Sequence, residues 1–189
     1  MRITKKTVYE KYGIKYENDK IVSPIGNICE LLKEGNSKTG KQVFTFSILP
    51  GTNDFNIDIN GINYCMKGSC CCNCVGCYAK TGHYNHDTTI RSMAINTLLV
   101  NTDIDFVKRC IMAQLEYIGR GEIRIHAAGD FNVADPDSYA AMWFDIAKRF
   151  NSFRFWTYTK IKKYESLFDS LKNANIVKNR FHDFIHFWK

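Results

Sequence analysis

A dense run of cysteines between residues 65 and 77 constrains this chain more than any other feature. Six of the eight cysteines lie in that run. They are Cys65, Cys70, Cys71, Cys72, Cys74 and Cys77. Thiolates this close together are typical ligands of soft metals, whereas cystines suit a reducing compartment poorly and idle thiols gain the protein little. The sequence therefore predicts a metal-binding loop. The other two cysteines, Cys29 and Cys110, stand alone on segments predicted to be helical, and we expect both to be small core residues.

The cysteine spacing is compatible with two kinds of metal centre. Cys70, Cys74 and Cys77 follow the pattern C-x3-C-x2-C, which suits a [4Fe-4S] cluster with one iron left open. An open iron can chelate the amino and carboxylate groups of S-adenosylmethionine. Cys71, Cys74 and Cys77 are instead spaced for a tetrahedral zinc ion. Candidates for the fourth zinc ligand are Cys65, Cys72, His83 and His86. Because three cysteines are adjacent at 70–72, spacing alone leaves the register open.

Composition and charge limit the class of protein. The chain has 189 residues, of which 45% are hydrophobic, and this is enough for one domain with a sizeable core. We find neither an apolar run of the ~18 residues that span a membrane nor a signal peptide, so we expect a cytoplasmic protein without membrane contact. The net charge of +7 comes from the two ends of the chain, and residues 21–159 are neutral. Solvated surface lysines are therefore the simpler interpretation, and nucleic-acid contact is the alternative.

Apolar periodicity predicts alternating strands and helices. Strands are expected over 42–49, 122–127 and 153–159 and from 176, and helices over 25–34, 86–100, 103–118, from 136 and over 163–172. Thr102 and Asp135 are the expected N-caps of two of these helices. Asn60-Gly61 between alternating apolar residues predicts a hairpin over 55–64, because both residues tolerate positive φ. The alternation is typical of parallel strands joined by right-handed crossovers.

Parallel strands deliver their C-terminal ends to one edge of a sheet, where ligands gather. The first strand leads towards the cysteines, the second to His126 and Asp130, and the third to Trp156, Tyr158 and Lys160. We therefore expect these residues to meet at one rim. His126 and Asp130 suit proton transfer, or else they are a hydrogen-bonded core histidine and a turn cap. Trp156 or Tyr158 suits stacking of a base or an adenine.

Five motifs in fixed order over residues 42–162 resemble the phage gene product 88 domain family. They are FTFSILPG at 44–51, CVGCYA at 74–79, IRIHAAGDF at 123–131, Trp143, and FWTYTK at 155–160. This pattern is similar to that of radical S-adenosylmethionine proteins, with a cysteine loop after the first strand and a glycine–acid motif after the second. The resemblance implies that Cys70, Cys74 and Cys77 hold a [4Fe-4S] cluster. It also implies that Gly129 and Asp130, together with Tyr78, bind S-adenosylmethionine.

The resemblance also implies a fold. We expect an α/β protein built as a partial (half) βα barrel, with mostly parallel strands and an inserted β-hairpin before the cysteine-rich metal loop. A single domain over 1–189 would comprise an N-terminal extension (1–41), a βα core (42–178) and a C-terminal tail (179–189). A half-length sheet leaves edges that the N-terminal segment or the partner in a homodimer has to cover.

Two functions are expected from these features. The first is an iron–sulfur, S-adenosylmethionine-type protein of a phage or mobile element, located in the cytoplasm of a host bacterium. It would act on a nucleotide, nucleic acid or peptide through His126, Asp130, Tyr158 and Lys160. The second is a non-catalytic protein whose loop is stapled by metal, zinc included, and which inhibits a host defence or other nucleic-acid complex. Whether the chain is an enzyme stays open between the two.

Overall fold

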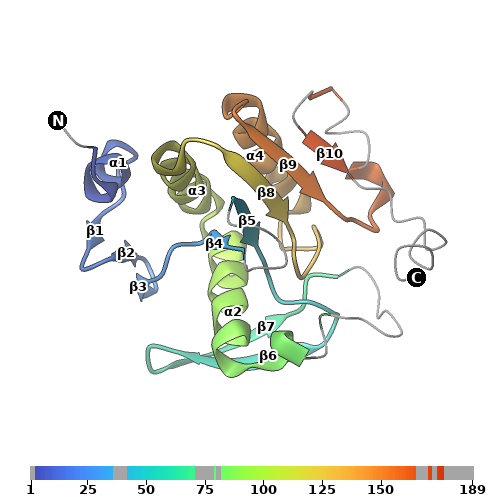
Figure 1. Ribbon diagram of the computed structural model, residues 1–189. Helices are drawn as coiled ribbons and strands as arrows, with labels where there is room; N and C mark the ends of the chain where they lie inside the picture. Colours follow the sequence, from blue (N-terminus) through green and yellow to red (C-terminus); the bar gives the residue numbers. More distant parts are fainter. Residues whose placement is uncertain are drawn as a thin grey trace.

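The computed structural model describes residues 3–35, 42–70, 79, 82–164, 170–171 and 174–176. Its centre is a five-stranded sheet (Figure 1). In spatial order the strands are β4 (Lys33–Glu34), β5 (Val43–Phe46), β8 (Gly121–Ile125), β9 (Phe153–Thr157) and β10 (Ala174–Ile176). The last four are parallel, and β4 runs antiparallel to β5. The expected α/β fold with parallel core strands is therefore confirmed, and the described residues form no closed barrel.

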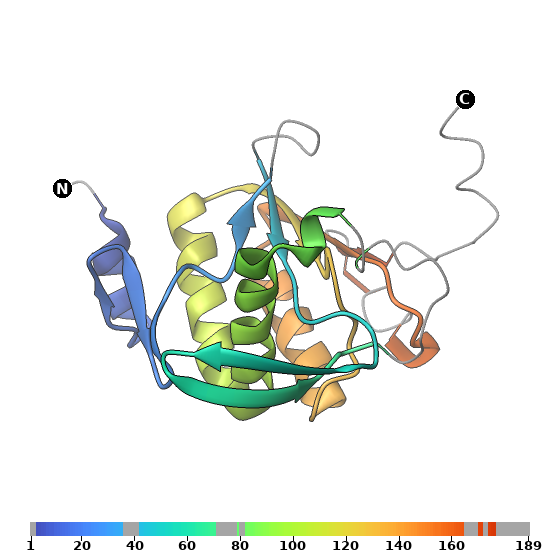
Figure 2. The ribbon, with the colours of Figure 1, turned by 90° about the horizontal axis from the view of Figure 1, so that it is seen from below.

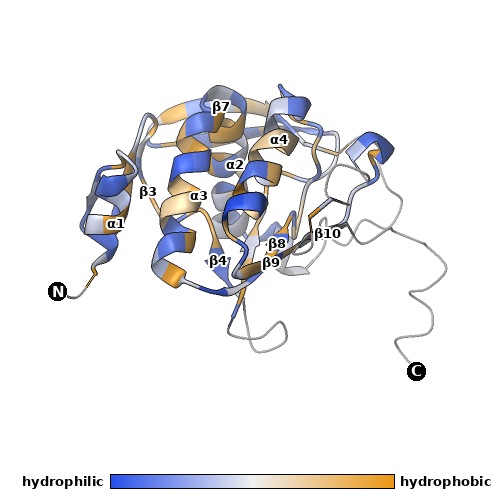
Figure 3. Ribbon diagram, turned by 90° about the horizontal axis from the view of Figure 1, so that it is seen from above, coloured by the Kyte–Doolittle hydropathy of each residue, from blue (hydrophilic) through white to orange (hydrophobic). Residues whose placement is uncertain are grey.

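Three long helices cover one face of this sheet. They are α2 (Asp87–Thr102), α3 (Ile104–Ile118) and α4 (Pro136–Arg149). Figure 3 shows α3 and α4 above the strands, and Figure 2 shows α2 beside them. The parallel strands follow one another in chain order, and the described helices that connect them, α2, α3 and α4, lie on the same side. Consequently, the opposite face is left without a helical layer among the described residues.

Local sequence signals explain where the helices begin. The Asp135 carboxylate accepts a hydrogen bond from the Ser138 N–H at 3.1 Å, and Pro136 occupies the first turn, as predicted. The prediction for α3 was one residue off. Asp103, and not Thr102, caps this helix by accepting the Phe106 N–H at 2.9 Å. Thr102 instead ends α2, where its hydroxyl donates to the Leu98 carbonyl.

The core lies between the sheet and the helices. Phe46, Ile123, Ile125 and Phe155 project from alternate strand positions and are buried against the helices. Trp143 of α4 packs edge-on against Phe46, with ring centroids 5.4 Å apart. This period-two burial shows that the intervening residues of β8 and β9 belong to the opposite face.

The N-terminal residues form a small unit beside α3, and here the sequence prediction was wrong. Instead of a helix over 25–34, the chain forms α1 (Lys5–Lys11) and a sheet of β1 (Tyr16–Glu17), β2 (Lys20–Ser23) and β3 (Gly26–Ile28). Ile28 pairs with Ile21, which buries both side chains across a hairpin. Cys29 follows as an exposed residue that accepts a hydrogen bond from Lys20 Nζ at 3.0 Å, so it is not in the core. Cys110 is buried as predicted.

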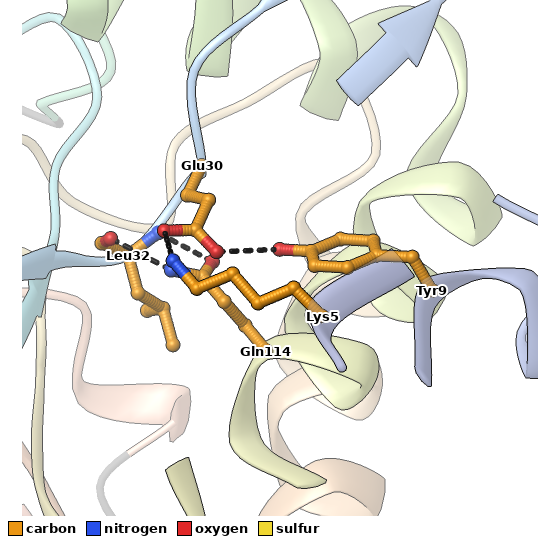
Figure 4. Close-up of polar contacts among 5 residues, drawn as sticks. All are labelled: Lys5, Tyr9, Glu30, Leu32 and Gln114. Carbon is orange, nitrogen blue, oxygen red and sulfur yellow. Dashed lines mark hydrogen bonds and ion pairs between the residues drawn. The ribbon is translucent and has the colours of Figure 1, made fainter. Parts of the chain in front are cut away.

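Tertiary contacts hold this unit to α3 (Figure 4). The Gln114 side chain bonds both backbone groups of Leu32, at 3.0 Å to its N–H and 2.9 Å to its carbonyl. The Glu30 carboxylate accepts from Lys5 at 3.0 Å and from the Tyr9 hydroxyl at 3.3 Å. These partners lie far apart in the sequence, so helical spacing could not reveal them. The adjoining β4 covers the β5 edge of the central sheet, one of the two solutions expected for that edge.

The predicted hairpin is confirmed as β6 (Asp54–Ile59) and β7 (Ile62–Lys67). Asn60 and Gly61 both have positive φ, at 57° and 83°. The hairpin packs along α2 (Figure 2), where Met66 joins a cluster with Met93 and other apolar side chains.

The remaining short elements are the 3-10 turns η2 (Gly82–Asn85) and η3 (Lys162–Tyr164). Of the helix expected over 163–172, residues 165–169 and 172 lie outside the described residues. Residues 170–171 are not helical. Among the helices that the structure describes, none is long and apolar enough to cross a membrane.

Candidate functional site

The C-terminal ends of β5, β8 and β9 meet at one rim, as predicted. The Ala127 N–H donates to the Phe46 carbonyl and the Ile48 N–H to the Ala128 carbonyl, both at 3.1 Å. The segments that follow β5 and β8 therefore stay hydrogen-bonded to each other beyond the strands. The segment after β7 enters the same rim, since the Ser69 N–H donates to the Leu49 carbonyl at 2.8 Å. The start of the cysteine loop is therefore joined to the strand ends.

Ser69 connects three segments of this rim. Its hydroxyl donates to the Leu49 carbonyl at 2.7 Å and accepts from the Asp130 N–H at 3.1 Å. The residue is 1% exposed. Sequence reasoning missed Ser69, because a serine beside a cysteine carries no distinguishing signal. Its partners are known only once the strands are paired.

Gly129 fits this rim because it has no side chain. Its φ is +90°, and a Cβ there would lie 2.5 Å from Ile48 Cγ1 and 2.7 Å from Ser69 Oγ. The absence of a Cβ lets the β8 loop approach the β5 end and the cysteine loop closely. The glycine–acid motif thus has a packing role that is independent of any ligand.

Of the three predicted ligands of a [4Fe-4S] cluster, Cys70 is the one that lies within the described residues. Its N–H donates to the Gly51 carbonyl at 2.9 Å, and its Sγ accepts from the Gly51 N–H at 3.1 Å. The Asn132 side chain donates to the Cys70 carbonyl at 3.2 Å. Backbone N–H groups directed at sulfur are a recurrent feature of thiolates that hold iron–sulfur clusters, because they stabilise negative charge on sulfur. The surroundings of Cys70 therefore fit a metal-bound thiolate.

The other candidate ligands are only partly described. Cys71, Cys72, Cys74 and Cys77, together with Tyr78 and the side chain of His83, lie outside the described residues. Cys65 is exposed on β7, and His86 is exposed at the start of α2. Within the ranges that the structure describes, no three metal-ligating side chains gather. The metal prediction therefore depends on the residues that follow Cys70.

Asp130 ties the β8 loop to the β9 loop. Its carboxylate accepts from the Thr159 hydroxyl at 2.7 Å, the Phe131 N–H at 2.8 Å and the Lys160 N–H at 3.1 Å. The residue is 5% exposed. Burial raises the pKa of Asp130, and the hydrogen bond from Thr159 opposes that rise. This carboxylate holds the rim together and fixes the backbone of Lys160, whose side chain is exposed and interacts electrostatically with Asp130.

His126 lies among core residues. It has a φ of +61° and is 2% exposed, with Nε2 2.8 Å from the Tyr139 hydroxyl and its ring edge-on to Phe131. Strand alternation would put it on the face of Arg124, but the left-handed backbone turns it towards α4. Burial lowers the pKa of His126 to about 3, so the ring stays neutral at physiological pH. Of the two interpretations that the sequence allowed, this geometry favours the core histidine.

The face of the sheet opposite the helices presents a cluster of aromatic and basic side chains. The Arg124 guanidinium lies 5.2 Å from the Trp156 ring centroid and 5.9 Å from that of Tyr158, and the two rings meet edge-on at 5.8 Å. Thr45 is in register with Arg124, and Arg124 with Trp156, across β5, β8 and β9. Sequence reasoning proposed Trp156 and Tyr158 as ligand-facing residues but missed Arg124. The signal was available, because an arginine between two buried isoleucines must lie on the other face of its strand.

Comparisons with known proteins address the family. Searches of curated proteins and of solved structures found no match. A family model described as gene product 88 matches residues 30–182. The matched range includes all five motifs quoted above and every strand of the central sheet. The model covers well over half of the sequence, so the chain belongs to the gene product 88 family.

Proposed function

We propose that the chain is an iron–sulfur, S-adenosylmethionine-type protein of a phage or mobile element that acts in the cytoplasm of a host bacterium. Its substrate would be a nucleotide, nucleic acid or peptide. The observation that carries the proposal is Cys70, whose backbone is fixed to Gly51 and whose sulfur accepts the Gly51 N–H at 3.1 Å. Cys70 directly precedes the segment that holds Cys71, Cys72, Cys74 and Cys77, and it lies at the rim where three parallel strands end.

The topology of the sheet supports the same proposal. Four parallel strands follow in chain order, and the connecting helices that the structure describes, α2, α3 and α4, lie on one side, as in the wall of a βα barrel. We propose that the sheet is a half-barrel whose inner side is the face without helices. In such a fold, a metal centre at the C-terminal rim would border both the loops and the inner face.

Each predicted site residue has a role in this proposal. Cys70, Cys74 and Cys77 would hold a [4Fe-4S] cluster, whose open iron would bind S-adenosylmethionine and supply reductive cleavage chemistry. Tyr78 and the bare backbone at Gly129 would border that cofactor. Tyr158 and Lys160 would face the substrate.

His126 and Asp130, which the sequence suggested for proton transfer, would instead hold the rim in position. Each makes a buried hydrogen bond, His126 with Tyr139 and Asp130 with Thr159.

Metal analysis of protein purified without oxygen tests this proposal. We expect iron together with acid-labile sulfide, a brown colour, and cleavage of S-adenosylmethionine under reduction. Cys74→Ser should lose iron and colour, whereas the matched control Cys29→Ser should keep both, because Cys29 is exposed on the N-terminal unit. A colourless anaerobic preparation without iron would refute the proposal.

A second candidate function is a metal-stapled binding protein that inhibits a host defence or other nucleic-acid complex. It is favoured by one observation: His126 and Asp130 are both buried and engaged in hydrogen bonds inside the rim. A protein that only binds needs no exposed acid–base pair. This candidate predicts equimolar zinc, or a cluster that cleaves no cofactor, and unfolding when a chelator removes the metal.

A further inference from the structure

The inner face of the central sheet, opposite the helices, combines basic and aromatic side chains. Parallel sheets are ordinarily covered by helices on both faces, and strands covered in this way are apolar on both sides. Here the helix side of β8 and β9 carries buried apolar side chains. The inner side carries Arg124, Trp156 and Tyr158, none of them fully buried. A half-buried guanidinium beside two half-buried rings is an unusual lining for a face with only a structural role.

The charges on this face favour an anionic partner. Arg124 lies in its middle, Lys33 is in register with Thr45 at the β4 edge, and the exposed Lys160 stands at the rim. The acidic Glu122 lies one register row away, and its carboxylate is 3.7 Å from the Arg154 guanidinium. Asp130 interacts electrostatically with Lys160, and Glu30 with Lys33, but basic side chains still outnumber acidic ones on this face.

The aromatic side chains indicate which class of anionic partner this face suits. Trp156 and Tyr158 present ring surfaces suited to stacking on a base, and base–aromatic stacking is the main sequence-tolerant contact to single strands. An arginine that stacks on aromatic rings is a recurrent element of nucleic-acid recognition. A duplex hides the faces of its bases, and an acidic peptide would need the cations but not the rings.

We propose that this inner face, built from Arg124, Trp156 and Tyr158, binds single-stranded nucleic acid. Bases stack on the two rings, while Arg124 and Lys160 contact phosphates. The inference rests on the proposed function in that the bound strand is the substrate of the rim centre, and it narrows that substrate to single-stranded nucleic acid. The surface itself is defined by β8 and β9, which do not depend on the metal.

Fluorescence anisotropy with labelled oligonucleotides tests the proposal on the full chain. The probes are single-stranded DNA and RNA of about 12 nucleotides, within the usual range for one binding surface, and the matching DNA duplex. We expect the single strands to bind more tightly than the duplex, and Trp156→Ala and Tyr158→Ala each to weaken their binding by about 5- to 100-fold. Arg124→Gln should also reduce the dependence of log affinity on log salt by about one unit.

The chain supplies a matched aromatic control. Tyr117 on α3 is 44% exposed and has the Lys5 ammonium 5.4 Å from its ring centroid, so it is also an aromatic ring beside a cation, but it lies away from the sheet. Tyr117→Ala should leave oligonucleotide affinity unchanged, as should Arg91→Gln on α2.

Several outcomes overturn the proposal. One is equal affinity in Trp156→Ala, Tyr158→Ala and the controls, and another is a duplex that binds as tightly as the single strands. Absence of oligonucleotide binding in protein with full metal content refutes the inference and leaves the metal proposal intact. Cys74→Ser should lose the metal and keep oligonucleotide binding, since the surface does not depend on the metal. Conversely, if the wild-type protein binds oligonucleotides but contains no iron, the surface survives and its link to the metal centre fails. Binding of an acidic peptide in place of the oligonucleotides would assign the face to a protein partner and overturn the proposal.

Discussion

Replacing Gly129 with alanine should destabilise the protein strongly, because two independent penalties meet at this position. Its φ of +90° is unfavourable for a residue with a Cβ, at a cost of about 1–2 kcal/mol. The new methyl group would also lie 2.5 Å from Ile48 Cγ1, 2.7 Å from Ser69 Oγ and 2.8 Å from the Ile48 carbonyl oxygen. Overpacking of this kind adds about 1–3 kcal/mol. We therefore expect Gly129→Ala to lower the free energy of unfolding by about 2–5 kcal/mol.

Gly61 provides the matched control for this measurement. Its φ is +83°, near that of Gly129, but a Cβ there would meet no atom within 4 Å. Gly61→Ala should therefore show the backbone penalty alone, about 1–2 kcal/mol. Urea denaturation followed by circular dichroism gives both free energies. If the two variants lose the same stability, the close approach of the β8 loop, Ile48 and Ser69 is not a constraint, and the packing argument for the glycine–acid motif is refuted.

Two further predictions concern titratable groups. The pKa of His126 is lowered to about 3 by burial, so the unfolded chain binds more protons than the folded one below its ordinary pKa of about 6.5. Stability should fall as the pH drops from about 6.5 towards 3, by about 1.4 kcal/mol per pH unit, and His126→Asn should flatten that slope in urea titrations. An unchanged slope in this variant would contradict the argument from burial. The pKa of Cys29 is lowered by the hydrogen bond from Lys20, so Lys20→Met should slow iodoacetamide labelling of Cys29 near neutral pH, measured by mass spectrometry. Lys15→Met is the control for loss of charge, and equal labelling rates in both variants would contradict a role for the 3.0 Å contact.

Local signals were sufficient where a residue determines its own conformation. Asn60 and Gly61 require a tight turn, and Asp135 with Pro136 marks a helix start wherever the helix then packs. The rim was also predictable, because parallel pairing follows from the order of strands and helices. It brings the residues after β5, β8 and β9 together without any knowledge of side-chain contacts.

The failures share a physical cause, which is dependence on partners distant in the sequence. Residues 25–34 contain apolar residues at helical spacing, but Gln114 and Ile21 stabilise an extended chain there. His126 departs from strand alternation because its own left-handed backbone turns its side chain towards the helices. Ser69 and Arg124 matter through neighbours that only the folded sheet supplies.

The tight junction before the cysteines has a practical consequence for protein engineering. A Cβ on Gly68 would collide with the backbone oxygens of Pro50 and Gly51, and Ser69 and Cys70 are fastened to the same strand end. An insertion or deletion at residues 68–70 would therefore disturb the end of β5. Exchange of the cysteine loop between family members should keep Gly68, Ser69 and Cys70 in place, and it should also keep Ala79, which is buried in the apolar cluster beneath the hairpin.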